Sequence, residues 1–294
     1  MFRRTFVASP LAVTATLFSA SALHAAPKKP GIVSLTFDDG LRSQKNALVI
    51  MQQLGLVGTL FVIADPNTPT TPESSPSSDP TILRVQRFSW SDIIEFHNAG
   101  WEVGAHSVHH EKLTNLSDRE LCWELDDCRH IITRNTGIVP QAFASPDGAY
   151  DDRTLVEIQK RFRSHFGVWG AGPLTKADLL CNPNRIDPYE VCRLGVTGKI
   201  PPVRDLFGFI DKAMATGYWL NLVYHNILPP DQILADDNLS VRVDVFKETA
   251  LYLSSLQRGK AIRVMTVTGA QDQIYVDYPW SPVARALATK RPPI

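Results

Sequence analysis

The sequence predicts an α/β fold, an irregular (β/α) barrel of about seven parallel strands in a single domain. Short apolar runs typical of buried strands alternate with amphipathic runs typical of helices along almost the whole chain. The length of 294 residues suits one barrel domain. Several apolar runs also end in Asp or His side chains, as expected where the carboxyl ends of parallel strands form a site.

The overall composition is that of a globular protein. Hydrophobic residues make up 44% of the chain and charged residues 20%. Thirty basic and thirty acidic residues cancel, and no basic stripe interrupts the balance. The sequence therefore gives no reason to expect a nucleic acid as a partner.

The first 26 residues are expected to be a signal peptide. Arg3 and Arg4 precede an apolar stretch at residues 5–22, and small residues follow near Ala25. The two arginines also resemble a twin-arginine export signal. Because the apolar run is short and contains Pro10, a stable membrane anchor is not expected. The catalytic domain would span 27–294 and work in the periplasm or outside the cell.

The first elements expected after the signal are a strand at 32–37, a helix at 43–54 and a strand at 57–63. The next stretch, about 65–80, is rich in Pro, Ser and Thr and has no apolar periodicity. It is expected to be an exposed loop inserted in the domain, either disordered or facing substrate.

The middle of the chain begins with a short helix expected to open at Ser91, followed by a strand at 102–105 that ends at His106. A longer helix should start at Ser117, which has capping-box spacing to Glu120. Its expected buried face consists of four residues at helical spacing: Leu121, Leu125, Cys128 and Ile132.

The remaining strands are expected at 141–145, 165–169, 192–196, 219–224 and 262–267, and the remaining helices at 152–161, 206–215 and 243–256. The region 171–205 has few signals beyond loop residues, apart from its one strand. The alternation of strands and helices favours crossover connections and a parallel sheet that is closed or nearly closed.

Four cysteines in an exported chain make disulfides possible. Cys122 and Cys128 are six residues apart on one expected helix, hence about 240° apart around its axis, so a bridge between them would need a broken helix. Cys181 and Cys192 flank a short loop and are the more plausible pair. No C-x-x-C spacing occurs, which disfavours a zinc site built from these cysteines.

A metal site is expected from histidines and carboxylates instead. His106 and His110 are four residues apart, a spacing that suits two ligands on one ion. Asp38 and Asp39 end the first strand, and either could be the third ligand. Two histidines and one carboxylate hold a catalytic divalent ion while leaving positions open for water and substrate. His109 is interpreted as non-ligating.

Three motifs together resemble the polysaccharide deacetylases, metal-dependent carbohydrate esterases with a nodulation-factor-deacetylase-like domain. They are TFDDG at 36–40, HSVHH at 106–110 and LVYH at 222–225. The resemblance covers roughly residues 31–270. It implies an irregular (β/α) barrel, in agreement with the fold expected from periodicity.

The resemblance also implies roles for individual residues. Asp39, His106 and His110 would bind the metal, most often zinc. Asp38 would be the general base that takes a proton from metal-activated water, and His225 the general acid that protonates the leaving amine.

The chain departs from the family pattern at its third motif, which usually has an arginine paired with the catalytic aspartate, followed by a proline and an aromatic residue. Here Ala144 stands at the arginine position and Asp147 at the aromatic one. The resemblance implies that the backbone N–H of Asp147 stabilises the oxyanion, a role that needs no particular side chain. We expect Arg193, on the strand at 192–196, to replace the missing guanidinium.

The fourth motif of the family, an aspartate followed by a tryptophan, has no clear match. Trp169 falls near a strand end and could stack on a sugar ring. The other five tryptophans, Trp90, Trp101, Trp123, Trp219 and Trp280, are expected to pack in the core or against helices.

These features predict an exported, metal-dependent deacetylase of an N-acetylated glycan such as peptidoglycan, a chitin-type oligomer or an N-acetylglucosamine polysaccharide. An O-acetyl polysaccharide esterase is the close alternative, because the same site can attack esters. A catalytically silent glycan-binding or scaffold protein of the same fold is the rival from another class. The oligomeric state is left open.

Overall fold

The computed structural model describes residues 29–65, 86–171, 173–197, 203–233, 237–279 and 282. The expected signal peptide at 1–26 and nearly all of the Pro/Ser/Thr-rich loop therefore lie outside the described residues. Seven parallel strands form the centre of the fold: β1 (Gly31–Asp38), β2 (Thr59–Val62), β3 (Glu102–Ala105), β4 (Ala142–Ala144), β5 (Ser164–Val168), β7 (Val191–Gly195) and β8 (Trp219–Tyr224).

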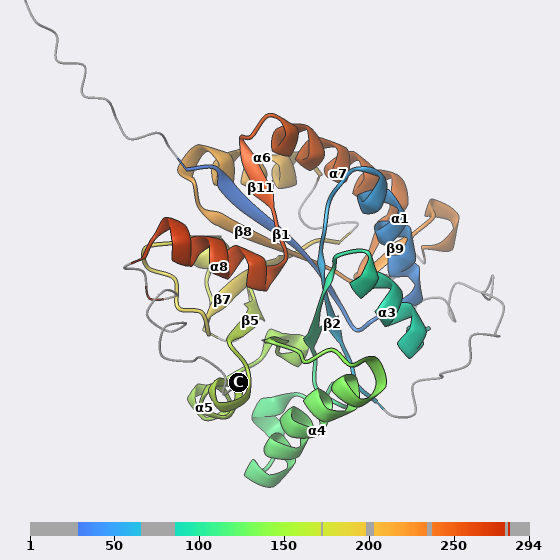
Figure 1. The fold of residues 1–294 in the computed structure, drawn as a ribbon, viewed down its shortest axis with the longest axis vertical. Helices are drawn as coiled ribbons and strands as arrows, with labels where there is room; N and C mark the ends of the chain where they lie inside the picture. Colours follow the sequence, from blue (N-terminus) through green and yellow to red (C-terminus); the bar gives the residue numbers. More distant parts are fainter. Residues whose placement is uncertain are drawn as a thin grey trace, which may run out of the picture.

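These strands close into a barrel, as predicted. They pair in the order β1-β2-β3-β4-β5-β7-β8, and β8 pairs back with β1 along its length, from Ile32 opposite Trp219 to Phe37 opposite Tyr224. Since all seven strands are parallel, their carboxyl ends share one rim of the barrel. Figure 1 shows the helices arranged around these strands.

The barrel is irregular at its other end, where two short strands are wedged in. β11 (Ile262–Val264) pairs with residues 31–33 of β1, whereas β2 pairs only with residues 36–38. β6 (Leu180–Cys181) runs antiparallel to the start of β8. A separate two-stranded sheet joins β9 (Asn226–Leu228) to β10 (Ser240–Arg242). β6, β9 and β10 were not predicted, because each has only two or three residues and lies in no long apolar run of the sequence.

The described helices are α1 (Lys45–Gln53), α3 (Trp90–Asn98), α4 (Asp118–Thr136), α5 (Asp152–Arg161), α6 (Val203–Thr216), α7 (Val243–Arg258) and α8 (Val267–Asp277). The predicted capping box between Ser117 and Glu120 opens α4, and Gly137 ends it in a left-handed conformation with φ of 75°. The four predicted core residues of α4 are buried. Within the described part of the chain, no helix has the length and apolar character needed to cross a bilayer.

The short 3-10 helices complete the described secondary structure: η1 (Arg42–Gln44), η2 (Leu113–Asn115), η3 (Pro146–Gly148), η4 (Lys176–Leu179) and η5 (Pro230–Gln232). Two of them come soon after the carboxyl end of a barrel strand. η1 follows β1, and η3 follows β4.

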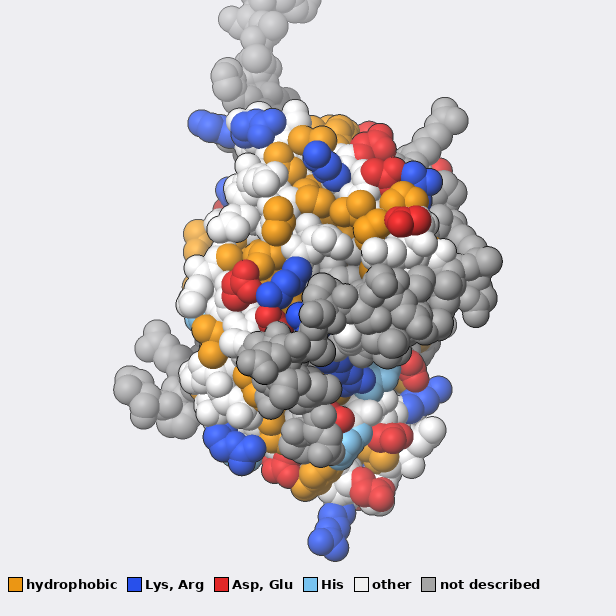
Figure 2. Space-filling view, turned by 90° about the vertical axis from the view of Figure 1, so that its right-hand side faces the viewer, with side chains coloured by type: hydrophobic (Ala, Val, Ile, Leu, Met, Phe, Trp, Pro, Cys, Tyr) orange, Lys and Arg blue, Asp and Glu red, His pale blue; other side chains and the backbone are white. Residues whose placement is uncertain are grey.

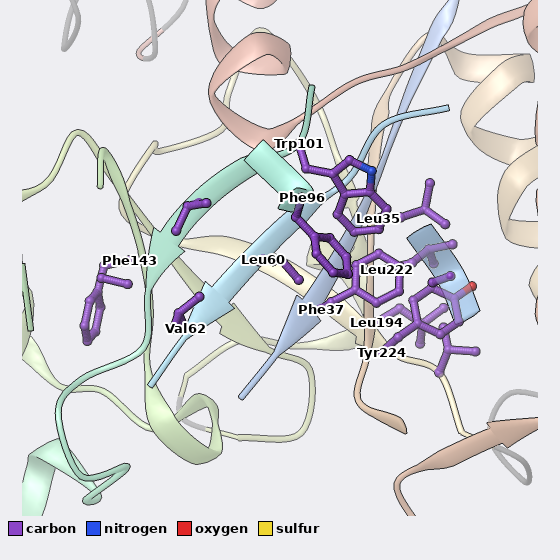
Figure 3. Packing of buried hydrophobic residues seen from close by; sticks show 14 of the residues in the cluster. Leu35, Phe37, Leu60, Val62, Phe96, Trp101, Phe143, Leu194, Leu222 and Tyr224 are labelled. Atoms are coloured by element: carbon purple, nitrogen blue, oxygen red, sulfur yellow. The ribbon is translucent and has the colours of Figure 1, made fainter. Parts of the chain in front are cut away.

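The core has an outer and an inner layer because successive side chains of each strand point to opposite faces. On β1, Val33, Leu35 and Phe37 face outward into the larger cluster, between the sheet and the helices. In Figure 3, Phe37 lies beside Phe96, Trp101 and Tyr224. The centroids of the Phe37 and Trp101 rings are 4.9 Å apart. The opposite face of β1 points into the barrel and carries Ile32, Ser34, Thr36 and Asp38.

Helix α8 was not expected, and the strand predicted to run to residue 267 ends at Val264. The side chain of Thr266 caps α8 instead. The helix docks at the amino ends of the strands, where the backbone N–H of Thr268 donates to the Glu102 carboxylate at 2.9 Å. Its stability comes from this docking and from the buried Ile274 rather than from strong periodicity.

The start of α3 also differs from the prediction by one residue. The helix begins at Trp90 rather than Ser91, because Ser89 forms a capping box with Asp92. Both serines satisfy the composition of a cap, and only the hydrogen-bond geometry distinguishes them.

All four cysteines are free thiols, so Cys181 and Cys192, the more plausible pair from the sequence, do not form a disulfide. Cys181 packs in the cluster inside the barrel, whereas Cys192 packs in the outer cluster. The two side chains therefore point to opposite faces of the sheet although their strands are close. Burial raises the pKa of each thiol to about 12.

Candidate active site

The two adjacent carboxylates at the carboxyl end of β1 point in different directions. Asp38 is the last residue of the strand and keeps the inward direction set by Thr36 and Ser34. Asp39 has a left-handed backbone with φ of 73°, which turns its side chain toward the loop after β3. The end of β1 thus directs the Asp38 carboxylate into the barrel and the Asp39 carboxylate toward the loop after β3.

The loop after β3 brings two imidazoles to Asp39. The Nε2 atoms of His106 and His110 each lie 3.5 Å from Asp39 Oδ1. Ser107 and His110 have positive φ values of 62° and 61°, and the Ser107 hydroxyl accepts the backbone N–H of His110 at 2.9 Å. This tight backbone turn, rather than an α-helix, places the two rings together, with centroids 4.9 Å apart.

The donor set fits a divalent cation. The three candidate ligand atoms of Asp39, His106 and His110 lie within 4.8 Å of one another. Asp39 Oδ1 is buried and has no hydrogen-bond partner among the described residues, which is costly unless a cation neutralises it. His106 Nδ1 lies 2.8 Å from the carbonyl oxygen of Ala144, so Nδ1 carries the proton and Nε2 is left free to ligate.

The charge states of Asp39 and His110 also suit a metal. For His106, burial acts to lower the pKa, but the carboxylates of Asp38 and Asp39 hold it above its usual value. Burial acts to raise the pKa of Asp39, but the contact with His106 and the charge of His225 hold it well below its usual range. Burial lowers the pKa of His110, and His106 acts in the same direction. Asp39 therefore stays anionic and His110 neutral, the forms that bind metals.

Arg193 on β7 forms a two-pronged ion pair with Asp38. Its Nη1 and Nη2 atoms lie 2.7 and 2.9 Å from Asp38 Oδ1 and Oδ2. The guanidinium is fully buried, donates also to Thr36 Oγ1 and to the carbonyl of Gly167, and lies over the Phe61 ring. Burial acts to raise the pKa of Asp38, but Arg193 and His106 hold it below its usual value.

Gln44, in the segment after β1, links the end of β1 to the end of β8. Asp38 is the last residue of β1, and His225 directly follows β8. The Gln44 amide Nε2 donates to the carbonyl oxygens of Asp38 at 2.6 Å and His225 at 3.1 Å. Gln44 is fully buried. Its neighbours add two more bonds, from Ser43 to Asn226 and from Asn46 to the carbonyl of Ile227. The imidazole of His225 is half-buried and contributes to the lowered pKa of both Asp38 and Asp39.

Asp147 and Trp169 lie at the same rim of the barrel. Asp147 has a left-handed backbone with φ of 55° in a tight turn after β4, and its side chain is exposed. Trp169 follows β5, donates its backbone N–H to the carbonyl of Arg193 at 3.0 Å, and is 38% exposed. The other site residues predicted from the sequence thus lie at the carboxyl ends of the strands, and Arg193 reaches Asp38 from within β7.

Comparison with known proteins agrees with this arrangement. The sequence model of the family described as "Polysaccharide deacetylase" matches residues 25–163. In this stretch the chain is similar to the polysaccharide deacetylases. A relative in this family, the peptidoglycan-N-acetylmuramic acid deacetylase PdaC of Bacillus subtilis (strain 168), is 26% identical over 144 residues. That alignment spans 48% of this chain and 26% of the relative.

Two solved structures of such proteins share the fold. Peptidoglycan deacetylase PdaC from Bacillus subtilis aligns with a TM-score of 0.50 and 17% identity, covering 90% of this chain and 98% of that structure. The Xyl-CE4 domain of a multidomain xylanase from the hindgut metagenome of Trinervitermes trinervoides aligns with a TM-score of 0.52 and 15% identity, covering 86% of this chain and 94% of that domain. At these identities the likeness concerns the fold alone.

Two sets of contacts around the candidate site were not predicted from the sequence. Glu124 is a buried carboxylate on α4 that accepts the backbone N–H groups of Val108 and His109. Its position three residues after Leu121, on the apolar face of the helix, was a usable signal. Gln44 gave no such signal, because its partners are backbone carbonyl groups and one of them, that of His225, lies 181 residues away in the sequence.

A buried histidine supports the turn that contains Asp147. His165 Nε2 lies 2.8 Å from Ser145 Oγ, and its Nδ1 lies 2.7 Å from the carbonyl oxygen of Tyr189. Both His165 and Ser145 are fully buried. Burial lowers the pKa of His165 to about 4, and the Arg193 charge acts in the same direction.

This histidine should make the fold less stable in acid. The unfolded chain takes up a proton near the ordinary pKa of 6.5 and the folded protein only near 4, so stability falls as pH drops from 6.5 toward 4. The expected loss from this residue is about 2 kcal/mol between pH 7.5 and pH 5. Urea unfolding at both pH values should show a smaller acid-induced loss in His165→Gln than in the wild type. Equal losses in both proteins would contradict the assignment.

Proposed function

We propose that this protein is a metal-dependent hydrolase that removes acetyl groups from an N-acetylated glycan. One observation carries the proposal: a buried Asp39 oxygen without a hydrogen-bond donor faces the Nε2 atoms of His106 and His110, while Arg193 holds Asp38 beside them. The similarity to a peptidoglycan-N-acetylmuramic acid deacetylase supports a glycan as substrate. Peptidoglycan, chitin-type oligomers and N-acetylglucosamine polysaccharides are the candidate substrates.

Asp39, His106 and His110 would hold the metal, and their mixed oxygen and nitrogen donors suit zinc. A bound divalent ion supplies two things in such a site, a lowered pKa for water and polarisation of the acetyl oxygen. The remaining steps fall to side chains of the chain itself.

Asp38 is the proposed general base. Arg193 keeps its carboxylate ionised and fixes its orientation through two hydrogen bonds, so that the group is ready to accept a proton from water. His225 is the proposed general acid, which passes a proton to the leaving amine. Gln44 donates hydrogen bonds to the backbone carbonyls of both residues. These two bonds limit how far Asp38 and His225 can move apart.

The rim of the barrel would bind the developing oxyanion and the sugar. The backbone N–H of Asp147 is the proposed oxyanion donor, since this role needs no particular side chain. The exposed indole of Trp169 is the proposed stacking surface for the reacting sugar. A glycan substrate also fits the proposed export of the domain at 27–294 to the periplasm or the cell exterior.

Acetate release from a panel of glycans tests the proposal. The panel contains N-acetylated and O-acetylated polymers, and the protein is used zinc-loaded and chelator-stripped. We expect zinc-dependent acetate release from N-acetylated glycans, lost on chelation and restored by zinc. Release from O-acetylated polymers alone would make the protein an O-acetyl esterase.

A different outcome would overturn catalysis altogether. If the folded protein binds stoichiometric zinc and releases no acetate from any glycan, it is a binding or scaffold protein. Direct measurement of zinc content and of glycan binding by calorimetry distinguishes this result from simple loss of the metal.

A further inference from the structure

We propose that Trp123 and His109 form a second sugar-binding platform, next to the metal centre, that holds a glycan ring other than the one that reacts. The inference rests on the proposed glycan substrate and adds an extended binding site to it. The ligand class is a pyranose ring of a polysaccharide, which offers an apolar face of C–H groups to an aromatic surface.

The two rings lie against each other and remain accessible to solvent. Trp123 on α4 is 44% exposed, in contrast to the packed position expected from the sequence. Its ring stacks on the His109 imidazole at a centroid distance of 5.1 Å and an interplanar angle of 17°. Among the described residues, Trp123 and Trp169 are the tryptophans with large exposed surfaces.

The platform is held in place before any ligand binds. The buried Glu124 accepts the backbone N–H of His109 at 3.0 Å and faces its Nδ1 atom at 2.8 Å. It also accepts the backbone N–H of Val108 at 2.7 Å. A carboxylate with three partners fixes the imidazole, and the imidazole fixes one face of the Trp123 indole. A rigid aromatic surface loses little conformational entropy on binding.

The location of the platform favours a polymeric substrate. His109 directly precedes His110, a proposed metal ligand, so the platform adjoins the metal centre along the chain. α4 starts after the loop that leaves the carboxyl end of β3, and the stacking on His109 places the Trp123 indole beside that loop. Figure 2 shows histidine side chains accessible on one face of the molecule beside acidic and basic side chains. A chain of several sugars could therefore contact the metal centre and Trp123 together.

Substrate length is the variable that tests the platform. We compare acetate release from an N-acetylglucosamine hexamer and dimer in the wild type, Trp123→Ala and Trp123→Tyr. In Trp123→Ala, the ratio of kcat/KM for hexamer over dimer should fall about 10-fold through a higher KM for the hexamer. Trp123→Tyr keeps an aromatic face and should restore most of the ratio. Tyr275→Ala is the matched control, because Tyr275 is an equally exposed aromatic residue on α8, at the opposite end of the barrel.

Binding without turnover separates this inference from the proposed function. Calorimetry with the hexamer and zinc-loaded Asp38→Asn protein should show about 10-fold weaker binding when Trp123→Ala is added. An unchanged hexamer affinity, or equal losses for hexamer and dimer, would overturn the platform even if the enzyme releases acetate. If no glycan releases acetate but Trp123→Ala still weakens hexamer binding, the proposed catalysis fails and the platform stands.

Discussion

Replacing Arg193 by alanine is expected to lower kcat about 100-fold, or about 2.7 kcal/mol of transition-state stabilisation, while leaving the zinc content unchanged. The guanidinium fixes both Asp38 oxygens and is not a candidate metal ligand. Its loss leaves the Asp38 carboxylate buried without its partner, which raises its pKa and frees its orientation. Zinc content, measured by atomic emission, and kcat on the best glycan substrate are the two readouts.

Loss of stability could imitate loss of catalysis, because removing one member of a buried ion pair costs about 3–5 kcal/mol of folding free energy. A second substitution separates the two effects. Ala144 lies inside the barrel on β4, at the position where the family motif has its arginine. Ala144→Arg in the Arg193→Ala background should restore most of the lost kcat. Full activity of Arg193→Ala, or zinc loss in parallel with activity, would refute the proposed role of Arg193.

The second large effect concerns the adjacent carboxylates, which should respond differently to the same isosteric change. Asp39→Asn is expected to weaken zinc binding about 100-fold, because an amide oxygen replaces the charged ligand that faces His106 and His110. Asp38→Asn is expected to keep the zinc affinity within about 3-fold and to lower kcat about 1,000-fold, the size expected for a lost general base. Zinc affinity is measured by competition with a chromophoric chelator.

Each of the two variants serves as the control for the other. They lie on consecutive residues and remove the same charge, so a general electrostatic effect would act on both alike. Since Asp38→Asn leaves Arg193 without its anion, its folding must be verified by urea unfolding before kcat is interpreted. Equal losses of zinc in both variants would contradict the division between a ligand and a base.

Much of the fold follows from local patterns. The helix α5 and the strand β8 have the predicted bounds, and the capping box of α4 lies at the predicted serine. These elements combine clear periodicity with strong end signals, so that local and tertiary preferences agree. α8 has weak amphipathicity, and contacts with the barrel decide its conformation. Its existence could not be recognised from the sequence alone.

In the candidate site, too, some features follow from local sequence and others depend on the tertiary structure. The motifs identify Asp38, Asp39 and the two histidines, because each motif is a short continuous segment at the end of a strand. The alternatives for the third metal ligand stayed open, since Asp38 and Asp39 are chemically identical. The backbone of Asp39, with its positive φ, directs its carboxylate to the histidines, while Asp38 stays with the inward face of β1.

The sequence by itself determined the barrel, its strand order along the chain and the motifs that end its strands, because hydrophobic periodicity and turn chemistry are local properties. Only the tertiary structure decided which distant groups meet. Arg193 reaches Asp38 across 155 residues because β7 and β1 direct these side chains into the same barrel interior. Cys181 and Cys192 stay apart because they lie on opposite faces of the sheet. Closing a barrel fixes these directions, and no segment of the chain carries that information alone.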